Sequence, residues 1–228
     1  MPPTLSYRLD LLTLLLVLWG SATSRGAEPA QTLRGHQGWT ISVAWRPDGQ
    51  QLASGSGDHT IRLWNPAAGK TVRTLTGHTS YVYCVAWNHD GTRLATASYD
   101  HTIGVWNARN GQRLATLRGH VNAVMGIDWS PDGTRLVSGS QDKLVKIWEV
   151  KSGRLLRTCS GHTDLVISVA WSPDGKRIAS GGFDNTVRLW DANAETAPQV
   201  LRGHTAPLES VGWDRQAVIW SIPAGKPV

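Results

Sequence analysis

The sequence is poor in cysteine, methionine and phenylalanine, and the shortage of cysteine already excludes one class of protein. Among 228 residues there are 2 Cys, 2 Met and 1 Phe. A small secreted scaffold held together by disulfides would contain many more cysteines. Cys84 and Cys159 stand at different points of an internal repeat, and other copies carry Ser or Gly where Cys84 stands. We therefore expect the Cys84 thiol to pack in a core rather than to form a disulfide or a redox site.

Long apolar segments with a helical period are also missing after residue 30, while strand-forming residues and Gly are abundant. This composition predicts an all-β protein. The chain offers no closely spaced His or Cys of the zinc type, so we expect no metal and no cofactor. The net charge is +6, with the basic residues spread over the chain. Spread charges are typical of solvated strand faces, so we expect no nucleic acid to bind.

One apolar run stands near the N-terminus, at residues 11–19. It is preceded by Arg8, whose charge Asp10 offsets, and is followed by the small residues Gly20, Ser21 and Ala22. This outline predicts a signal peptide and export, to a periplasm or to the outside of the cell. The run is shorter than the roughly 20 residues that span a bilayer, so we expect no stable membrane span. An uncleaved signal that anchors the chain, or a mis-assigned start codon and a cytoplasmic protein, are the alternatives.

A pattern of Gly-His pairs and tryptophans repeats along the rest of the chain. Each His follows the previous one by 42 residues, and a Trp follows each of the first four by 28. A fixed period of this length indicates a repeat architecture, in which each unit buries its faces only against its neighbours. We divide the chain into a targeting segment, residues 1–26, and a repeat domain, residues 27–228, with copies at about 33–65, 75–107, 117–149, 159–191 and a truncated 201–221.

The most regular copy, residues 161–191, predicts a set of antiparallel strands. Residues 165–171 alternate as a strand, and the turn Ser172-Pro173-Asp174-Gly175 follows, in which Pro fixes φ and Gly takes the left-handed position. Residues 176–181 run back, and residues 186–190 form a third strand. A fourth strand precedes each Gly-His, as at residues 71–75. Four antiparallel strands in one period match one blade of a β-propeller.

The pairs Gly161-His162 and Trp190-Asp191 resemble the signatures of the WD40 repeat family. The other copies keep the Trp but end in Trp-Asn or Trp-Glu, and the resemblance covers about four fifths of the chain. It implies a β-propeller of WD40 blades, with four complete four-stranded blades and an incomplete fifth. It also implies a platform for protein partners that has no chemistry of its own.

Each complete copy carries a polar set with constant spacing. A Ser or Thr follows the His by 18 residues, an Asp by 22 and a Trp by 28. The set is similar to the structural tetrad of the WD40 family, a buried hydrogen-bonded chain in which each group supplies what its neighbour lacks. A catalytic triad is built once, beside an oxyanion hole, so four copies argue against catalysis. The expected tetrads are His36, Ser54, Asp58 and Trp64; His78, Thr96, Asp100 and Trp106; His120, Ser138, Asp142 and Trp148; and His162, Ser180, Asp184 and Trp190.

The fifth copy lacks 12 residues between its His and its Trp, and with them the tetrad hydroxyl and Asp. In a regular propeller, residues 30–33 would supply the fourth strand of this last blade. The short connection after Trp213 leads into an antiparallel strand, however, and that strand would then run parallel to the incoming N-terminal one. We therefore expect an open or imperfectly closed ring, whose exposed end blades self-associate or are completed by another chain.

Partners of WD40 proteins often bind the face formed by the turns after Gly-His and before the tetrad Asp. Exposed aromatic side chains at such a face are typical interface anchors. The candidates for partner binding are Trp39, Tyr81, Tyr83, Tyr99, Met125, Leu165 and Phe183. The alternative is that these side chains pack against one another between blades. His59 and His101 stand at a turn position that is Lys143 or Asn185 elsewhere, so we expect solvated turn residues there.

The sequence thus favours a non-catalytic protein-interaction scaffold whose protein partner it does not name. One alternative is a truncated or conditionally folded fragment of a longer WD40 protein, without independent activity. Another is an enzyme that uses the central cavity of the propeller, which would need carboxylates or His beyond the tetrads. Asp128 is the one charge on a first strand that is out of line with its equivalents, which are Ala44, Ala86 and Ala170.

Overall fold

The computed structural model describes residues 31–208, and this part of the chain is built of β-strands joined by turns and loops. The described residues from Leu33 on belong to one compact unit. The expected signal peptide and residues 209–228, which hold most of the fifth copy, lie outside the described residues.

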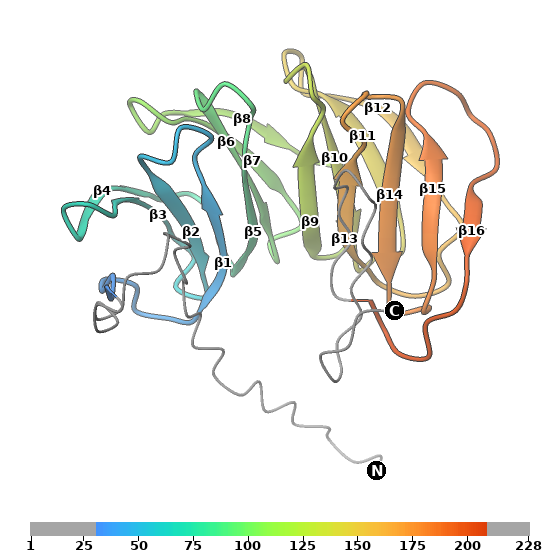
Figure 1. Ribbon diagram of the computed structural model, residues 1–228, viewed down its shortest axis with the longest axis horizontal. Coiled ribbons are helices and arrows are strands. Elements are labelled where there is room, and N and C mark those ends of the chain that lie inside the picture. The colour runs from blue at the N-terminus through green and yellow to red at the C-terminus, as the bar shows by residue number, and fades with distance from the viewer. Residues whose placement is uncertain (1–30, 209–228) are drawn as a thin grey trace, which may run out of the picture. The chain divides into compact units, whose positions relative to one another are not determined.

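The strands form four antiparallel sheets of four strands each, and every sheet is made of consecutive strands (Figure 1). The predicted set of four complete four-stranded blades is therefore confirmed. The first sheet holds β1 (Thr40–Trp45), β2 (Leu52–Ser56), β3 (Ile61–Asn65) and β4 (Lys70–Leu75). The second holds β5 (Val82–Trp87), β6 (Arg93–Ser98), β7 (Ile103–Asn107) and β8 (Arg113–Leu117). The third holds β9 (Val124–Trp129), β10 (Arg135–Ser140), β11 (Val145–Glu149) and β12 (Arg154–Cys159). The fourth holds β13 (Val166–Trp171), β14 (Arg177–Gly182), β15 (Val187–Asp191) and β16 (Gln199–Leu201).

Turns with left-handed residues join the strands of each sheet. Between β13 and β14, the N–H of Gly175 donates to the carbonyl of Ser172 at 2.8 Å, and Gly175 has φ +69°. A Cβ there would be strained, so the Gly of the Ser-Pro-Asp-Gly turn has a physical reason. The turn between the second and third strands is also left-handed, with φ of 60–70° at His59, His101, Lys143 and Asn185.

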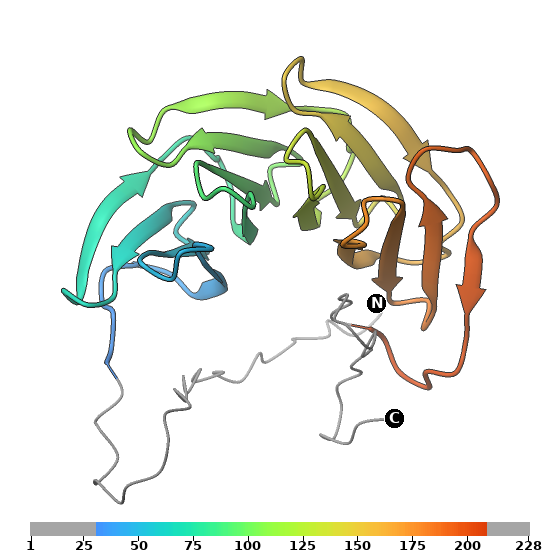
Figure 2. The same cartoon turned by 45° about the horizontal axis from the view of Figure 1, so that its top comes forward.

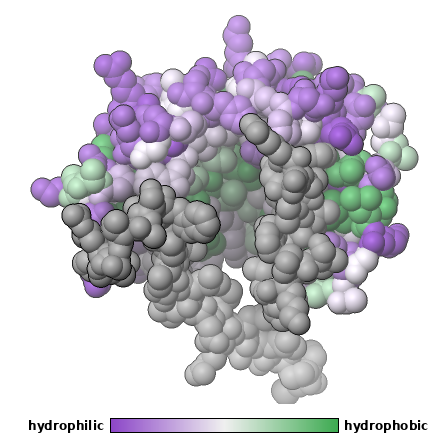
Figure 3. Space-filling view, in the orientation of Figure 1, coloured by the Kyte–Doolittle hydropathy of each residue, from purple (hydrophilic) through white to green (hydrophobic). Residues whose placement is uncertain are grey.

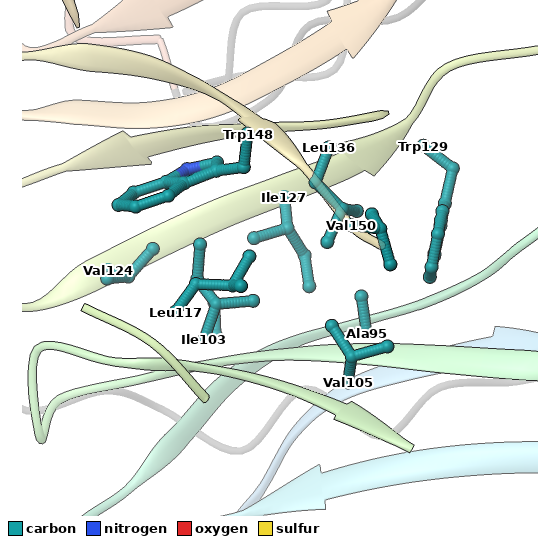
Figure 4. Packing of buried hydrophobic residues seen from close by; sticks show 11 residues of the cluster. Ala95, Ile103, Val105, Leu117, Val124, Ile127, Trp129, Leu136, Trp148 and Val150 are labelled. Carbon is teal, nitrogen blue, oxygen red and sulfur yellow. The ribbon is translucent and has the colours of Figure 1, made fainter. Parts of the chain in front are cut away.

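The core lies between neighbouring sheets. One cluster of buried side chains joins the second sheet, through Ile103, Val105 and Leu117, to Ile127 and Trp129 on the first strand of the third (Figure 4). Equivalent clusters join the first sheet to the second and the third to the fourth. Both cysteines are free thiols, and both pack in these clusters, as expected for Cys84.

The four sheets follow one another along an arc, with β1, β5, β9 and β13 side by side on its inner edge (Figure 2). The first and the fourth sheets lie at the two ends of the arc, so the described sheets do not close into a ring. Residues 31–33 have no regular structure, and the fifth copy, where a regular propeller would have their partner strand, lies mostly outside the described residues. None of the described strands pairs with them, and a strand needs such a partner for its backbone groups.

Candidate protein-interaction surface

In each sheet the His, the hydroxyl, the Asp and the Trp are joined by hydrogen bonds. In the third sheet, Trp148 Nε1 donates to Ser138 Oγ at 2.8 Å, and Ser138 Oγ lies 2.8 Å from His120 Nε2. His120 Nδ1 lies 2.7 Å from Asp142 Oδ2. A carboxylate only accepts, so the Nδ1–H donates to it, Nε2 accepts from the hydroxyl, and the hydroxyl oxygen accepts from the indole. The chain of donors therefore runs in one direction, from Trp to Ser to His.

The same chain links the other tetrads at similar distances. In the first sheet Ser54 Oγ lies 2.7 Å from His36 Nε2 and accepts from Trp64 Nε1 at 2.8 Å. The second sheet uses Thr96 in this place, and the fourth uses Ser180. The Nδ1 atoms of His36, His78 and His162 lie 2.7–2.9 Å from Asp58, Asp100 and Asp184.

The tetrad Asp fixes the two loops that form one end of each sheet. Asp142 accepts from the N–H of Val121, in the loop before β9, at 3.1 Å, and from the N–H of Leu144, in the turn after β10, at 3.0 Å. Burial acts to raise the pKa of Asp142, but its hydrogen bonds, above all that from His120, outweigh burial and hold this pKa below its ordinary value. The carboxylate is therefore charged at neutral pH and ties the two loops together.

Aromatic rings gather at this end of the first and second sheets. Tyr81 lies 6.2 Å from Trp39, 5.7 Å from His59 and 6.1 Å from Tyr99, measured between ring centroids. Tyr99 lies 6.0 Å from Tyr83. The planes of the paired rings are tilted by 40–52°, between a stacked and an edge-to-face arrangement. We call these five residues, Trp39, His59, Tyr81, Tyr83 and Tyr99, the aromatic cluster.

Backbone hydrogen bonds hold the aromatic cluster at the sheet ends while its rings stay accessible. The N–H of Tyr99 donates to the carbonyl of Tyr81 at 2.9 Å, and the N–H of Gly57 donates to that of Trp39 at 2.8 Å. Trp39 is 70% exposed, Tyr81 37% and Tyr99 42%. The rings thus pack against one another between adjacent sheets and are also exposed to solvent.

The remaining candidates lie elsewhere in the array. Phe183 and Leu165 meet at the same end of the fourth sheet, where the N–H of Phe183 donates to the carbonyl of Leu165 at 2.9 Å. Phe183 is exposed and Leu165 is half-buried. Met125 is half-buried in β9. Phe183 has no ring contact with the aromatic cluster among the described residues, whereas Met125 lies on β9, the neighbour of the strand β5 that carries Tyr83.

His59 is the member of the aromatic cluster that sequence reasoning missed. The repeat pattern placed it at a turn and favoured a solvated side chain. Its ring is half-buried instead and packs on Tyr81, from the neighbouring sheet. Its position one residue after the tetrad Asp, at the same sheet end as the tyrosines, was the signal that could have found it.

Among the described first strands, β1, β5, β9 and β13, Asp128 is the one charged side chain, so it could suggest chemistry on the inner edge. Its carboxylate accepts from the N–H of Trp129 at 2.9 Å and from the N–H of Trp171 at 2.7 Å, so it joins β9 to β13. Burial raises the pKa of Asp128 to about 6, against the opposing effect of these two hydrogen bonds. The group therefore joins two sheets of the scaffold.

Within residues 31–208, no group of three or more His, Cys, Asp or Glu side chains could hold a metal ion. A search of the same residues finds no helix that is long and apolar enough to span a membrane.

Comparison with protein families finds the WD40 family, described as "WD domain, G-beta repeat", at residues 27–65, 69–107, 111–149 and 153–191. Among solved structures, the chain is similar to U3-55K, with a TM-score of 0.72 and 30% identity. That similarity covers 78% of this chain and 56% of the other.

Curated relatives match shorter stretches. A Notchless protein homolog of Arabidopsis thaliana is 56% identical over 36 residues, which are 16% of this chain and 8% of that protein. Eukaryotic translation initiation factor 3 subunit I of Aspergillus niger is 41% identical over 61 residues, 26% of this chain and 17% of that protein. The pre-mRNA-splicing factor PRP46 of Yarrowia lipolytica is 48% identical over 40 residues, 18% of this chain and 9% of that protein. The matches thus span less than a fifth of each of these relatives.

Proposed function

We propose, from the premise that this chain belongs to the WD40 repeat family, that it is a non-catalytic scaffold which binds a protein partner through the aromatic cluster. The observation that carries the proposal is the row of exposed, mutually packed rings across two neighbouring sheets. Exposed Trp and Tyr side chains supply large contact areas at a small entropic cost, which is why they dominate binding energy at interfaces.

The polar groups beside the aromatic cluster support a protein partner rather than a reaction. Asp58 and Asp100 stand next to the cluster in sequence, but their carboxylates are held by His36 and His78 within the tetrads. They are positioned to fix loops and are not free to act as a general base. Relatives whose names place them in splicing and in translation initiation also agree with a role in assemblies.

Partner capture by surface variants tests this function. The full chain would serve as bait in a lysate of its own source, and the double variant Trp39→Ser, Tyr99→Ser would be compared with the wild type. We expect the variant to lose about 2 kcal/mol of binding free energy or more for the captured protein. The matched control is Leu114→Ser, an exposed apolar residue of β8 outside the cluster. Equal loss in both variants would contradict the proposed site.

We also propose that the protein is exported, on the strength of the apolar run at residues 11–19 and the small residues after it. Sequencing the N-terminus of the protein purified from its own source tests this proposal. A mature chain that begins near residue 27 is the expected result. A chain that keeps Met1 and fractionates with the cytoplasm would contradict it, and one that keeps Met1 in the membrane fraction would favour the anchored alternative.

A further inference from the structure

The aromatic cluster carries hydrogen-bond donors that the described part of the chain does not use. Within that part, no hydrogen bond joins the indole N–H or the phenol O–H groups of the cluster to the protein; these groups belong to Trp39, Tyr81, Tyr83 and Tyr99. Burial raises the pKa of Tyr83, and the nearby phenols of Tyr99 and Tyr81 raise it further. The Tyr83 hydroxyl is therefore protonated at neutral pH. A phenol O–H can donate and an indole N–H only donates, so the cluster offers several donors to a ligand.

The loops that carry the aromatic cluster present no free charge beside these donors. They contain no Lys or Arg, and Asp58 and Asp100 are their only acidic residues; the loops are residues 35–39, 57–60, 77–81 and 99–102. Each of these carboxylates accepts hydrogen bonds from its tetrad His and from the Thr two residues after it. A charged ligand would therefore find no free ion-pair partner in these loops.

Basic side chains stand on other elements, the fourth strands of the first three sheets. Lys70 and Arg73 belong to β4, Arg113 to β8, and Arg154 and Arg157 to β12. These strands lie on the outer edge of the arc (Figure 2). Hydrophilic residues cover the side of the molecule where Figure 1 has β8 and β12 (Figure 3). The groups that could attract an acidic partner thus belong to the outer strands and not to the aromatic cluster.

The known ways of binding a peptide segment differ in what they require of a surface. An added β-strand requires a free strand edge, but four of the five cluster residues lie in loops. A bound helix has its backbone groups bonded internally, so it gives the free donors of the cluster no backbone acceptor. A phosphorylated or acidic motif requires a group of Arg side chains, which these loops lack. A segment in the polyproline II conformation fits, because its backbone carbonyls are free and it docks on aromatic rings.

We propose that the aromatic cluster binds a proline-rich segment of the protein partner in the polyproline II conformation; this inference rests on the function proposed above. Proline has no N–H, so such a segment presents carbonyl acceptors without competing donors, which complements a surface of donors. Its rings are apolar and pack on the exposed rings of Trp39, Tyr81 and Tyr99.

The spacing of the rings suits such a segment. The centroids of Trp39 and Tyr81 lie 6.2 Å apart, and those of Tyr81 and Tyr99 lie 6.1 Å apart. A polyproline II helix has three residues per turn and advances about 9 Å in each turn. One turn is thus longer than one step along the row and shorter than two steps. A single turn therefore contacts rings from both sheets.

Fluorescence anisotropy with a labelled peptide of ten prolines tests the proposal on the full chain. We expect the wild type to bind this peptide at least about tenfold more tightly than a Gly-Ser peptide of the same length and label. The double variant Trp39→Ser, Tyr99→Ser should lose about tenfold or more in affinity, because exposed aromatic side chains dominate binding at such surfaces. The control Leu114→Ser, on β8, should bind the proline peptide as the wild type does. Circular dichroism shows whether each variant keeps its strands.

Two conservative variants separate the hydroxyls from the rings. Tyr81→Phe and Tyr99→Phe each keep the aromatic face and remove one donor. We expect at least one of them to bind the proline peptide roughly fivefold more weakly than the wild type, which is the effect of one hydrogen bond. Full affinity in both variants would contradict the matching of donors to free carbonyls.

Two further results would overturn the proposal. The first is a wild type that does not prefer the proline peptide to the Gly-Ser peptide. The second is a peptide of ten lysines that binds more tightly than ten prolines and that the double variant releases, because the rings would then take a cation.

The capture experiment described above distinguishes a failure of this inference from a failure of the proposed function. We expect an excess of the ten-proline peptide to displace the captured partner from the wild-type chain. A partner that the double variant loses but that the proline peptide does not displace would leave the proposed function standing and overturn the proline-rich ligand alone.

Discussion

The tetrad is the smallest unit on which this fold depends, because its hydroxyl and its imidazole each have a hydrogen-bond partner on both sides. Ser138 is fully buried between His120 and Trp148. Ser138→Ala would leave the indole N–H and the imidazole nitrogen without their partner. We expect the free energy of unfolding to fall by about 1–3 kcal/mol, measured by urea titration. The control Ser160→Ala, at an exposed residue after β12, should change it by less than about 0.5 kcal/mol. A loss no larger than that of the control would contradict this role of the tetrad.

Asp128 predicts a dependence of stability on pH. Its pKa is raised to about 6 in the folded chain, against about 3.9 in an unfolded one. The folded state therefore binds more protons between these values, and stability falls as the pH rises through them. Relative to Asp128→Ala, the free energy of unfolding of the wild type should fall by about 1–3 kcal/mol from pH 4 to pH 7, and stay level above.

Asp174 supplies a control of opposite sign. A hydrogen bond from the Ser172 hydroxyl and another from the N–H of Lys176 hold the pKa of this exposed carboxyl below its usual value. Relative to Asp174→Ala, the wild type should therefore lose stability as the pH falls through that lowered pKa. Chemical denaturation of both pairs of proteins across pH 3–7 checks the two signs. The same sign in both pairs would contradict the account of Asp128.

At the scale of the strand, the repeat pattern predicts where each strand lies better than it predicts how long the strand is. β16 has only three residues, whereas β12, at the same place in the third sheet, has six. Pro198 stands at the repeat position of Leu156, and β16 begins directly after it. Proline has no N–H to donate to a ladder, so it shortens the strand. The spacing of the tryptophans therefore does not predict the length of β16, whereas Pro198 does.

Strand β7 lacks the cationic residue that its equivalents in the other sheets carry. Gly104 stands where the other sheets have Arg62, Lys146 and Arg188. In the first sheet the guanidinium of Arg62 lies 5.9 Å from the ring of Trp64. In the second sheet Arg113, from the neighbouring strand β8, lies 5.0 Å from the ring of Trp106 and donates to the carbonyl of Gly77 at 2.8 Å. In the second sheet, the guanidinium beside the tetrad indole thus comes from the fourth strand, β8, and not from the third strand.

Gly104→Arg, which restores the residue type of the sister sheets, should therefore destabilise the chain. A Cβ at this position would lie 2.7 Å from Trp106 Nε1 and 2.8 Å from Thr96 Oγ1, within the tetrad. Such crowding forces the tetrad to shift, and we expect a loss of about 1–3 kcal/mol in the free energy of unfolding, measured by thermal and urea denaturation. A variant as stable as the wild type would contradict the crowding of a side chain at this position against Trp106 and Thr96.

At the scale of the whole molecule, most of the fold could be predicted from the sequence because the repeat shows which positions are equivalent. The number of complete sheets, the order of their strands and the free thiols agree with the prediction. Contacts between sheets could not be predicted in this way. Two examples are the packing of His59 on Tyr81 and the exposure of Trp45, which both depend on which sheet lies beside which. The repeat pattern does not show these neighbours, because it treats equivalent positions of all copies alike.

The candidate site was predicted in part for the same reason. The sequence indicated the sheet end and its aromatic residues, but only the geometry groups Trp39, Tyr81 and Tyr99 in one cluster and leaves Phe183 apart. A platform built from loops on rigid sheets places its binding residues on the loops, where copies of the repeat are free to differ. The differences between near-identical copies are therefore the part of this sequence that bears on function.

Site-specific photo-cross-linking in cells is the most direct test of the claim that the aromatic cluster binds a protein partner. A photoreactive phenylalanine analogue would replace Tyr81 or Tyr99 in the cluster, or the exposed residues Leu114 or Leu156 on fourth strands as controls. We expect one and the same protein to be cross-linked from positions 81 and 99 and not from positions 114 and 156. Equal labelling from all four positions, or labelling from the controls alone, would contradict the account.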